Sequence, residues 1–438
     1  MGIDQTSEVS TSLAGANIPV HEHATAPVVP QSESTAPTTV SRLLKFMGPA
    51  FIVSVAYMDP GNFGTNITAG SFFNYNLIWV ILWSNVFAIL LQTLSAKLGI
   101  ATGLDLPTHC RQLFSRRANW FLWSVAVVAA MATDLAELLG GSLGFYLLFG
   151  IPPVWGAILT GIMSYFILEL SRYGQQRVEA AISGLVSVIG LCFVVELFLV
   201  KPQWPQVVLH TLMPSLNSDS LFVAVGMLGA TVMPHVIFLH SHLVQSRRNR
   251  TSLTAMKEHL FLEKVDVCVA MNIAFVINAA MVVVSAATFY SRGMLVDSIE
   301  VAHQTLQPLM GKLSGVAFGV ALLASGLSSS TVGMYSGQVI MQGFVNVKLP
   351  VWAERLITML PAVVIISLGL NPVRVLVTSQ VALSFTLPAA IIPLLLITSR
   401  KGVMGHFVND RATAVLGWTI CSLIVALNVA LLWSTFAG

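Results

Sequence analysis

The segment VAYMDPGNFGTN, residues 55–66, places a carboxylate, a proline and an amide inside a long apolar stretch. Proline removes one backbone hydrogen bond and collides with the preceding turn, so the Pro-Gly pair predicts a broken helix. The freed carbonyls near Ala56 and Tyr57, the Asp59 carboxylate and the Asn62 amide oxygen would then face one point. These are hard oxygen donors, which suit a cation.

A second interruption of the same kind lies in GMLGATVMPHVIFLH, residues 226–240. Here Pro234 follows Gly229 in the middle of an apolar stretch, much as Pro60 stands next to Gly61 in the first segment. A simple proline kink is the alternative for this second segment, because prolines commonly kink helices.

Met233, next to Pro234, adds a sulfur atom to the possible ligands. On an ordinary helix a methionine fills gaps in the core, and that is the alternative here. Beside a break that faces Asp59 and Asn62, its thioether would be a soft ligand. Soft sulfur disfavours Ca²⁺ and Mg²⁺ and favours transition metals, so the set suits Mn²⁺ or Fe²⁺.

The composition identifies the elements that must position these residues. The chain of 438 residues is 55% hydrophobic and 9% charged, with a mean hydropathy of +0.80, whereas soluble domains carry about 25% charged residues. Helices that cross a bilayer need about 20 mostly apolar residues. Eleven such stretches are present, at 44–70, 77–100, 119–149, 152–170, 178–200, 220–243, 265–290, 314–343, 353–370, 373–398 and 412–436. We predict an all-α polytopic membrane protein with eleven transmembrane helices, of which helices 1 and 6 are broken.

Apart from Asp59, three ionisable side chains fall near the middle of a span: Asp134, Glu137 and His235. A charge at the centre of a membrane helix costs at least about 2.5–3.5 kcal/mol, so each of them is a functional candidate. Asp134 and Glu137 are three residues apart and share a helix face. A structural polar pair capped by neighbouring hydroxyls is the alternative for these two carboxylates.

Two histidines near the end of the sixth span, His240 and His242, are expected to be interfacial polar residues.

The basic residues predict the orientation and the composition predicts the tail. With the N-terminus in the cytoplasm, 18 of the 22 Lys and Arg residues lie on the cytoplasmic side. An odd number of spans then puts the C-terminus outside. Residues 1–41, rich in Ser, Thr, Pro and Ala, are predicted to be a disordered cytoplasmic tail, and 42–438 the transmembrane domain. A net charge of +3 without basic-aromatic segments indicates no nucleic-acid partner.

The two interruptions fall at corresponding places in two halves of the chain. Spans 1 and 6 run in opposite directions, as expected for inverted five-helix repeats, here about 42–200 and 219–398, with an extra helix at 412–436. Paired broken helices of this kind mark the midplane binding sites of transporters. The symmetry is positional, without a residue-by-residue repeat.

The motifs DPGN, MPH and GLSSS, which begin at Asp59, Met233 and Gly326, resemble those of the Nramp family of proton-coupled divalent metal transporters, of the bacterial manganese type. The resemblance covers residues 42–436 and implies a LeuT-like fold. For the metal it implies a set of ligands and approaching groups: Asp59, Asn62, Met233, the carbonyls of Ala56 or Ala230, and Gln380.

The resemblance also implies a proton relay that runs from Asp59 toward the cytoplasm. Asp134 and Glu137 would carry it, with His235 near its start and Arg355 on the exit path. The family often has a second arginine immediately before this one, whereas this chain has Glu354.

We therefore expect a secondary active transporter, not an enzyme, in the bacterial inner membrane. It would import Mn²⁺, and also Fe²⁺, with protons by alternating access. The metal and the proton are its transported partners, so no cofactor is expected, and beyond the lipid bilayer no obligatory protein partner is predicted. The alternative is a sodium-coupled amino-acid symporter of the same fold, which has little need of Asp and Met at the breaks. A passive channel is disfavoured, because paired breaks suit alternating access. The sequence contains no HExxH motif of the kind found in metalloproteases, so an intramembrane enzyme is disfavoured as well.

Overall fold

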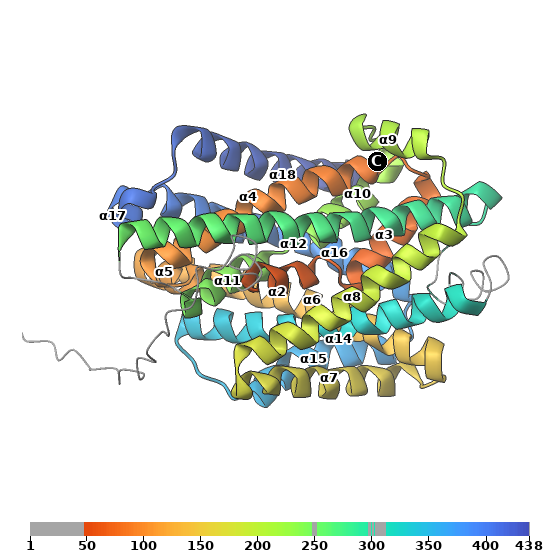
Figure 1. Cartoon of the computed structure of the whole chain (residues 1–438), viewed down its shortest axis with the longest axis horizontal. Coiled ribbons are helices and arrows are strands. Elements are labelled where there is room, and N and C mark those ends of the chain that lie inside the picture. Colours follow the sequence, from red (N-terminus) through yellow and green to blue (C-terminus); the bar gives the residue numbers. More distant parts are fainter. Residues whose placement is uncertain (1–47, 248–251, 297–298, 300–301, 303–311, 438) are drawn as a thin grey trace, which may run out of the picture. The chain divides into compact units, whose positions relative to one another are not determined.

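The computed structural model describes residues 48–247, 252–296, 299, 302 and 312–437, and all elements assigned to them are helices. The tail predicted at 1–41 lies outside the described residues. The long helices are α4 (Ile78–Thr102), α6 (Arg116–Phe149), α7 (Pro153–Glu169), α8 (Gln175–Leu199), α12 (Leu253–Thr288), α14 (Lys312–Val345), α15 (Val351–Ser367), α16 (Pro372–Thr398) and α18 (Arg411–Ala437) (Figure 1). Short connecting helices are α5 (Leu106–Leu113), α9 (Trp204–Leu212) and α17 (Lys401–Met404), with 3-10 turns at Leu170–Tyr173, Val244–Arg247, Tyr290–Arg292 and Gly405–Phe407.

Each of the eleven predicted apolar stretches coincides with a described helix or with a broken pair of helices. Within the described residues, nine segments are long and apolar enough to cross a membrane. The other two stretches miss that length for different reasons: the first is divided into two short helices, and α15 has 17 residues. The all-helical membrane fold is confirmed, and the count of eleven spans stays a prediction.

Both predicted breaks are present. The first span consists of α2 (Pro49–Ala56) and α3 (Pro60–Phe73), and the sixth consists of α10 (Ser218–Thr231) and α11 (Pro234–Leu243). Each proline is the first residue of the second half-helix, where its missing N–H would have had no intrahelical partner. The two glycines that were predicted as part of the breaks lie inside the helices instead, Gly61 in α3 and Gly229 in α10.

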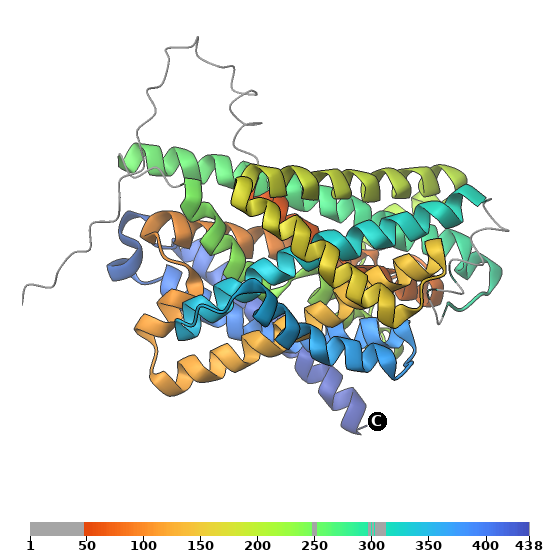
Figure 2. The ribbon, with the colours of Figure 1, turned by 90° about the horizontal axis from the view of Figure 1, so that it is seen from below.

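The broken helices lie among long ones. Helix α12 contacts both α2 and α3, α14 contacts α2 and α6, and α16 contacts α3 and α10. Figures 1 and 2 show α2, α3, α10 and α11 as short pieces among these long helices. Peripheral helices such as α7 and α18 instead expose large apolar side chains, among them Phe166 and Trp433. That division suits a protein whose outer surface faces lipid.

Glycines let α6 approach its neighbours closely. A Cβ atom added at Gly141 would lie 2.4 Å from the hydroxyl of Thr160, and one added at Gly144 would lie 2.7 Å from the Cα atom of Leu323. A Cβ atom added at Gly326 of α14 would likewise lie 2.5 Å from the backbone nitrogen of Gly141. The contact between α6 and α14 therefore depends on residues without a side chain.

Gly144→Ala should lower the free energy of unfolding by about 1–3 kcal/mol, because the new methyl group overlaps the backbone of α14, which has no room to move. Gly184→Ala in α8 is the matched control, since no atom of the described residues lies within 4 Å of a Cβ atom there. The midpoint temperature of thermal unfolding in detergent measures the stability of both variants. Equal midpoints for the two variants would contradict the close approach.

Candidate metal site

The two helix breaks are joined at Asn62. Its Nδ2 atom donates to Oδ1 of Asp59 at 2.8 Å and to the carbonyl of Ala230, near the end of α10, at 3.1 Å. The backbone N–H of Asn62 also donates to Oδ1 of Asp59 at 2.8 Å, which makes Asp59 the N-cap of α3. Because Nδ2 makes both side-chain bonds, the amide oxygen of Asn62 is the atom left to act as a ligand.

The side chains predicted to bind metal are closed off from solvent. Exposure is 0% for Asp59, Met233 and Gln380 and 1% for Asn62. Two buried oxygens, Oδ2 of Asp59 and Oε1 of Gln380, have no hydrogen-bond partner among the described residues. Buried polar atoms are normally paired, so these two unpaired oxygens are available to a ligand. A cation bound at either oxygen would supply the missing partner.

Gln380 of α16 lies against both broken helices. A Cβ atom at Gly61 would fall 1.8 Å from Nε2 of Gln380, so the glutamine amide occupies the space that this glycine leaves. A Cβ atom at Gly229 would fall 2.0 Å from the carbonyl oxygen of Gln380. The two glycines thus make room for Gln380, beside the Asp59 end of α3.

The carbonyls released by the first break have other partners. Asn278 of α12 donates to the carbonyl of Tyr57 at 2.6 Å, and Ser325 of α14 donates to that of Met58 at 2.6 Å. The carbonyl of Tyr57, which was expected to face the metal, thus accepts a bond from a side chain of α12, and its role at the metal stays a prediction. Ala56 ends α2, and Ala230 already accepts a bond from Asn62.

The donor set is mixed in chemistry. Within the described residues, no group of three or more His, Cys, Asp or Glu side chains is placed to hold a metal ion. A site here would instead combine the Asp59 carboxylate with amide and carbonyl oxygens. Met233, fully buried as the N-cap of α11 and three residues after Ala230, is the sulfur atom at the second break.

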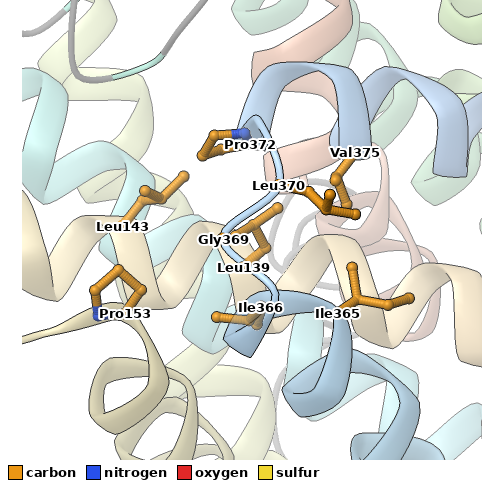
Figure 3. A pocket seen from close by; sticks show the side chains of 9 residues that line it. All are labelled: Leu139, Leu143, Pro153, Ile365, Ile366, Gly369, Leu370, Pro372 and Val375. Carbon is orange, nitrogen blue, oxygen red and sulfur yellow. The ribbon is translucent and has the colours of Figure 1, made fainter.

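An apolar cavity of about 200 Å³ opens between α6, α15 and α16. Figure 3 shows Leu143, Ile366 and other apolar side chains around it, together with Gly369. None of the predicted metal ligands lines this cavity. Its apolar walls offer no ligands to a cation, so it is separate from the candidate metal site.

The residues of the predicted proton relay gather around α6. Arg355 of α15 donates to Oδ1 of Asp134 at 2.7 Å, and both side chains are about 5% exposed. The guanidinium also bonds the hydroxyl of Ser330 in α14. Asp134 is therefore held in a buried ion pair. The side chain of Glu354 lies outside what the structure describes.

Glu137 lies one helical turn further along α6, without such a partner. Neither of its carboxylate oxygens has a hydrogen bond within the described part of the chain. A Cβ atom at Gly333 of α14 would come within 2.6 Å of Oε2. One turn beyond, a Cβ atom added at Gly140 would lie 2.0 Å from the Cβ atom of Pro60. Glu137 is therefore close to the first break.

His235 connects the second break with α6. Its Nδ1 atom lies 3.2 Å from the hydroxyl of Thr133, the residue before Asp134. Its Nε2 atom is buried and has no hydrogen-bond partner in the described segments. The structure thus brings all four predicted relay side chains, together with Arg355, to the region between the breaks and α15.

His240, predicted to be an interfacial polar residue, lies in the last turn of α11. It is fully buried, with Nδ1 2.9 Å from Oε1 of Gln92 and Nε2 2.9 Å from Oε1 of Glu263. Glu263 was outside the seventh predicted span, which began at 265, whereas α12 begins at Leu253. His242 is partly exposed and lies 3.1 Å from Asp105.

Three comparisons place these features among known proteins. The family model described as "Natural resistance-associated macrophage protein-like" (Nramp) matches residues 50–434. The chain is 57% identical over 400 residues to the "Divalent metal cation transporter MntH" of Caldanaerobacter subterraneus subsp. tengcongensis, covering 91% of this chain and 95% of that protein.

Two solved structures resemble the fold. A crystal structure of the manganese transporter of Eremococcus coleocola has a TM-score of 0.81 and 35% identity, over 91% of this chain and 88% of that one. Mhp1, a nucleobase-cation-symport-1 family transporter, has a TM-score of 0.59 and 15% identity over 88% of this chain and 90% of that one, a likeness of fold alone. With the family model matched over nearly the whole described region and relatives at this identity, the chain belongs to the Nramp family.

Proposed function

We propose that this protein is a multi-pass membrane transporter that imports Mn²⁺, and also Fe²⁺, together with protons by alternating access. One observation carries the proposal: two broken helices meet through Asn62 and Ala230 beside a buried carboxylate oxygen of Asp59 that has no partner among the described residues. The names of relatives, a divalent metal cation transporter and a manganese transporter, support the same substrate class.

The proposed ligands are Asp59, Asn62 and Met233, joined by the carbonyl of Ala56 or Ala230 and by Gln380 as the site opens to either side. Oxygen donors replace the hydration shell of the ion, and one sulfur donor favours Mn²⁺ and Fe²⁺ over Ca²⁺ and Mg²⁺. The sodium-coupled amino-acid symporter finds less support, because it has little use for a buried carboxylate and a thioether at the breaks.

The proposed driving force is electrochemical. No GxxxxGK[ST] motif for nucleotide binding occurs in the sequence. Moving one charge through the membrane potential supplies about 2.3 kcal/mol per 100 mV, and a divalent ion gains twice as much on entry. The excess of Lys and Arg on the predicted cytoplasmic side supports a cytoplasmic N-terminus and an outer C-terminus. A membrane potential that is negative inside would draw the cation into the cytoplasm of a bacterial cell.

Protons would travel along α6. Glu137 lies between the first break and the Arg355–Asp134 pair, and neither of its oxygens has a hydrogen bond in the described residues. A carboxyl group outside the ion pair of Arg355 with Asp134 can gain and lose a proton without breaking that pair. We therefore assign the exchanging position to Glu137, with Asp59 releasing its proton as the metal arrives.

Met233→Leu tests the sulfur ligand, because leucine keeps the shape and removes the thioether. Selectivity for Mn²⁺ over Ca²⁺ should fall about tenfold, or ~1.4 kcal/mol. Uptake of Mn²⁺ into proteoliposomes, measured with and without excess Ca²⁺, gives the selectivity of each variant. Met227→Leu is the control, since Met227 lies in the same α10–α11 span but packs in an apolar cluster with Tyr75 and Val223.

Two results would contradict this assignment. Unchanged discrimination in Met233→Leu would make Met233 a packing residue and leave the site with oxygen donors alone. An equal loss in Met227→Leu would trace the effect to packing of the span.

Glu137→Gln tests the proton path, because an amide has the shape of the carboxyl group and cannot exchange a proton. Mn²⁺ binding should remain, whereas acidification of the vesicle interior during uptake should fall to the level of protein-free vesicles. A pH-sensitive dye inside the vesicles reports this acidification. Glu169→Gln, at a partly exposed pair with Arg172, is the matched control. Parental proton entry in Glu137→Gln would remove Glu137 from the path.

A further inference from the structure

The α16 helix contains a carbonyl that its own backbone cannot satisfy. Pro388 lies inside α16 and has no N–H group. In a regular helix the N–H of residue 388 would donate to the carbonyl of Ser384, four residues earlier. An unpaired carbonyl at membrane depth is costly, so Ser384 needs a donor from outside its helix.

Asn428 of α18 supplies that donor. Its Nδ2 atom donates to the carbonyl of Ser384 at 2.9 Å, and its Oδ1 atom accepts from the Ser384 hydroxyl at 2.8 Å. Both bonds are buried, and Asn428 itself is 5% exposed. One side chain therefore replaces the bond that Pro388 removes and adds a second bond to the same residue.

The position of Asn428 on α18 shows that this contact is specific. The buried positions of α18 form one stripe: Gly417, Ile420, Cys421, Ile424, Asn428 and Leu431. Asn428 is the only amide among these positions, and the stripe packs on α16 and α10. An apolar stripe would suffice for packing, so the amide serves the carbonyl that it contacts.

The residue that Asn428 holds belongs to the same helical turn as Gln380. A Cβ atom at Gly229 would lie 2.0 Å from the carbonyl oxygen of Gln380 and 2.8 Å from the backbone nitrogen of Ser384. The turn from Gln380 to Ser384 is thus fixed by α10 through Gly229 and by α18 through Asn428. From this turn the Gln380 side chain reaches Gly61, two residues from Asp59.

We propose that Asn428 is a positioning residue of the metal site. By bonding the carbonyl that Pro388 leaves free, it fixes the turn of α16 that places the Gln380 amide against Gly61, two residues from Asp59. The helix that follows the two repeats thereby takes part in metal binding without contacting the ion. This inference rests on the proposed function, since it acts through Gln380 as a group that approaches the metal.

A double-mutant cycle on Asn428→Ala and Gln380→Ala tests the proposal. The KM for Mn²⁺ and the maximal rate per reconstituted transporter are measured for the parent, both single variants and the double variant. Asn428→Ala should raise KM about threefold or more, the factor that matches an average membrane hydrogen bond, and change the maximal rate less. In the Gln380→Ala background, Asn428→Ala should leave KM unchanged, because residues that act as a unit are not additive.

Asn272→Ala is the matched control, since that exposed amide donates to the Cys268 carbonyl of its own helix at 2.7 Å. It should leave KM at the parental value. If Asn428→Ala fails to fold, Ser384→Ala replaces it. That variant removes one of the two bonds and should raise KM to a smaller extent, again only when Gln380 is present.

An equal KM increase from Asn428→Ala in both backgrounds would overturn the inference, because α18 would then act on the fold in general. Unchanged KM in Asn428→Ala would overturn it as well. Failure of the proposed function looks different: the parent itself would take up no Mn²⁺ above protein-free vesicles.

Discussion

Backbone carbonyls that are released at membrane depth need donors from neighbouring helices, and the centre of this protein is organised around that need. The carbonyl of Tyr57 is bonded from α12, that of Met58 from α14 and that of Ser384 from α18. Each donor lies on a helix distant in the chain. The donors of these bonds hold α12 and α14 in fixed positions around the first break.

Some buried polar atoms have no partner among the described residues, and those of the proposed metal and proton sites are among them. Oδ2 of Asp59 and Oε1 of Gln380 are buried and unpaired among the described residues, whereas the neighbouring carbonyls are satisfied. Both carboxylate oxygens of Glu137 are in the same state, one turn from the pair of Asp134 with Arg355. The carbonyls of Tyr57 and Met58 at the first break are thus paired, whereas the groups proposed to bind metal and proton keep unpaired oxygens.

Small residues bring these groups together. Gly61 and Gly229 make room for Gln380, and Gly140 makes room for Pro60. The first two glycines suggest helix breaking when the sequence is considered one segment at a time, because Gly61 follows Pro60 directly, Gly229 precedes Pro234 in the same span, and Gly weakens a helix. Their role in the structure is different, since both lie within helices and admit a neighbouring side chain or carbonyl. The breaks themselves result from the prolines.

The sequence alone determined the helices, the two breaks and the residue types at them, because apolar length and proline chemistry act over neighbouring residues. It also singled out Asp59 and Glu137, since charges in apolar stretches are conspicuous. Only the tertiary structure decided which donors satisfy which carbonyls, and that His240 is buried. Asn278 and Tyr57 are 221 residues apart, and their contact depends on the packing of whole helices, which no local pattern encodes.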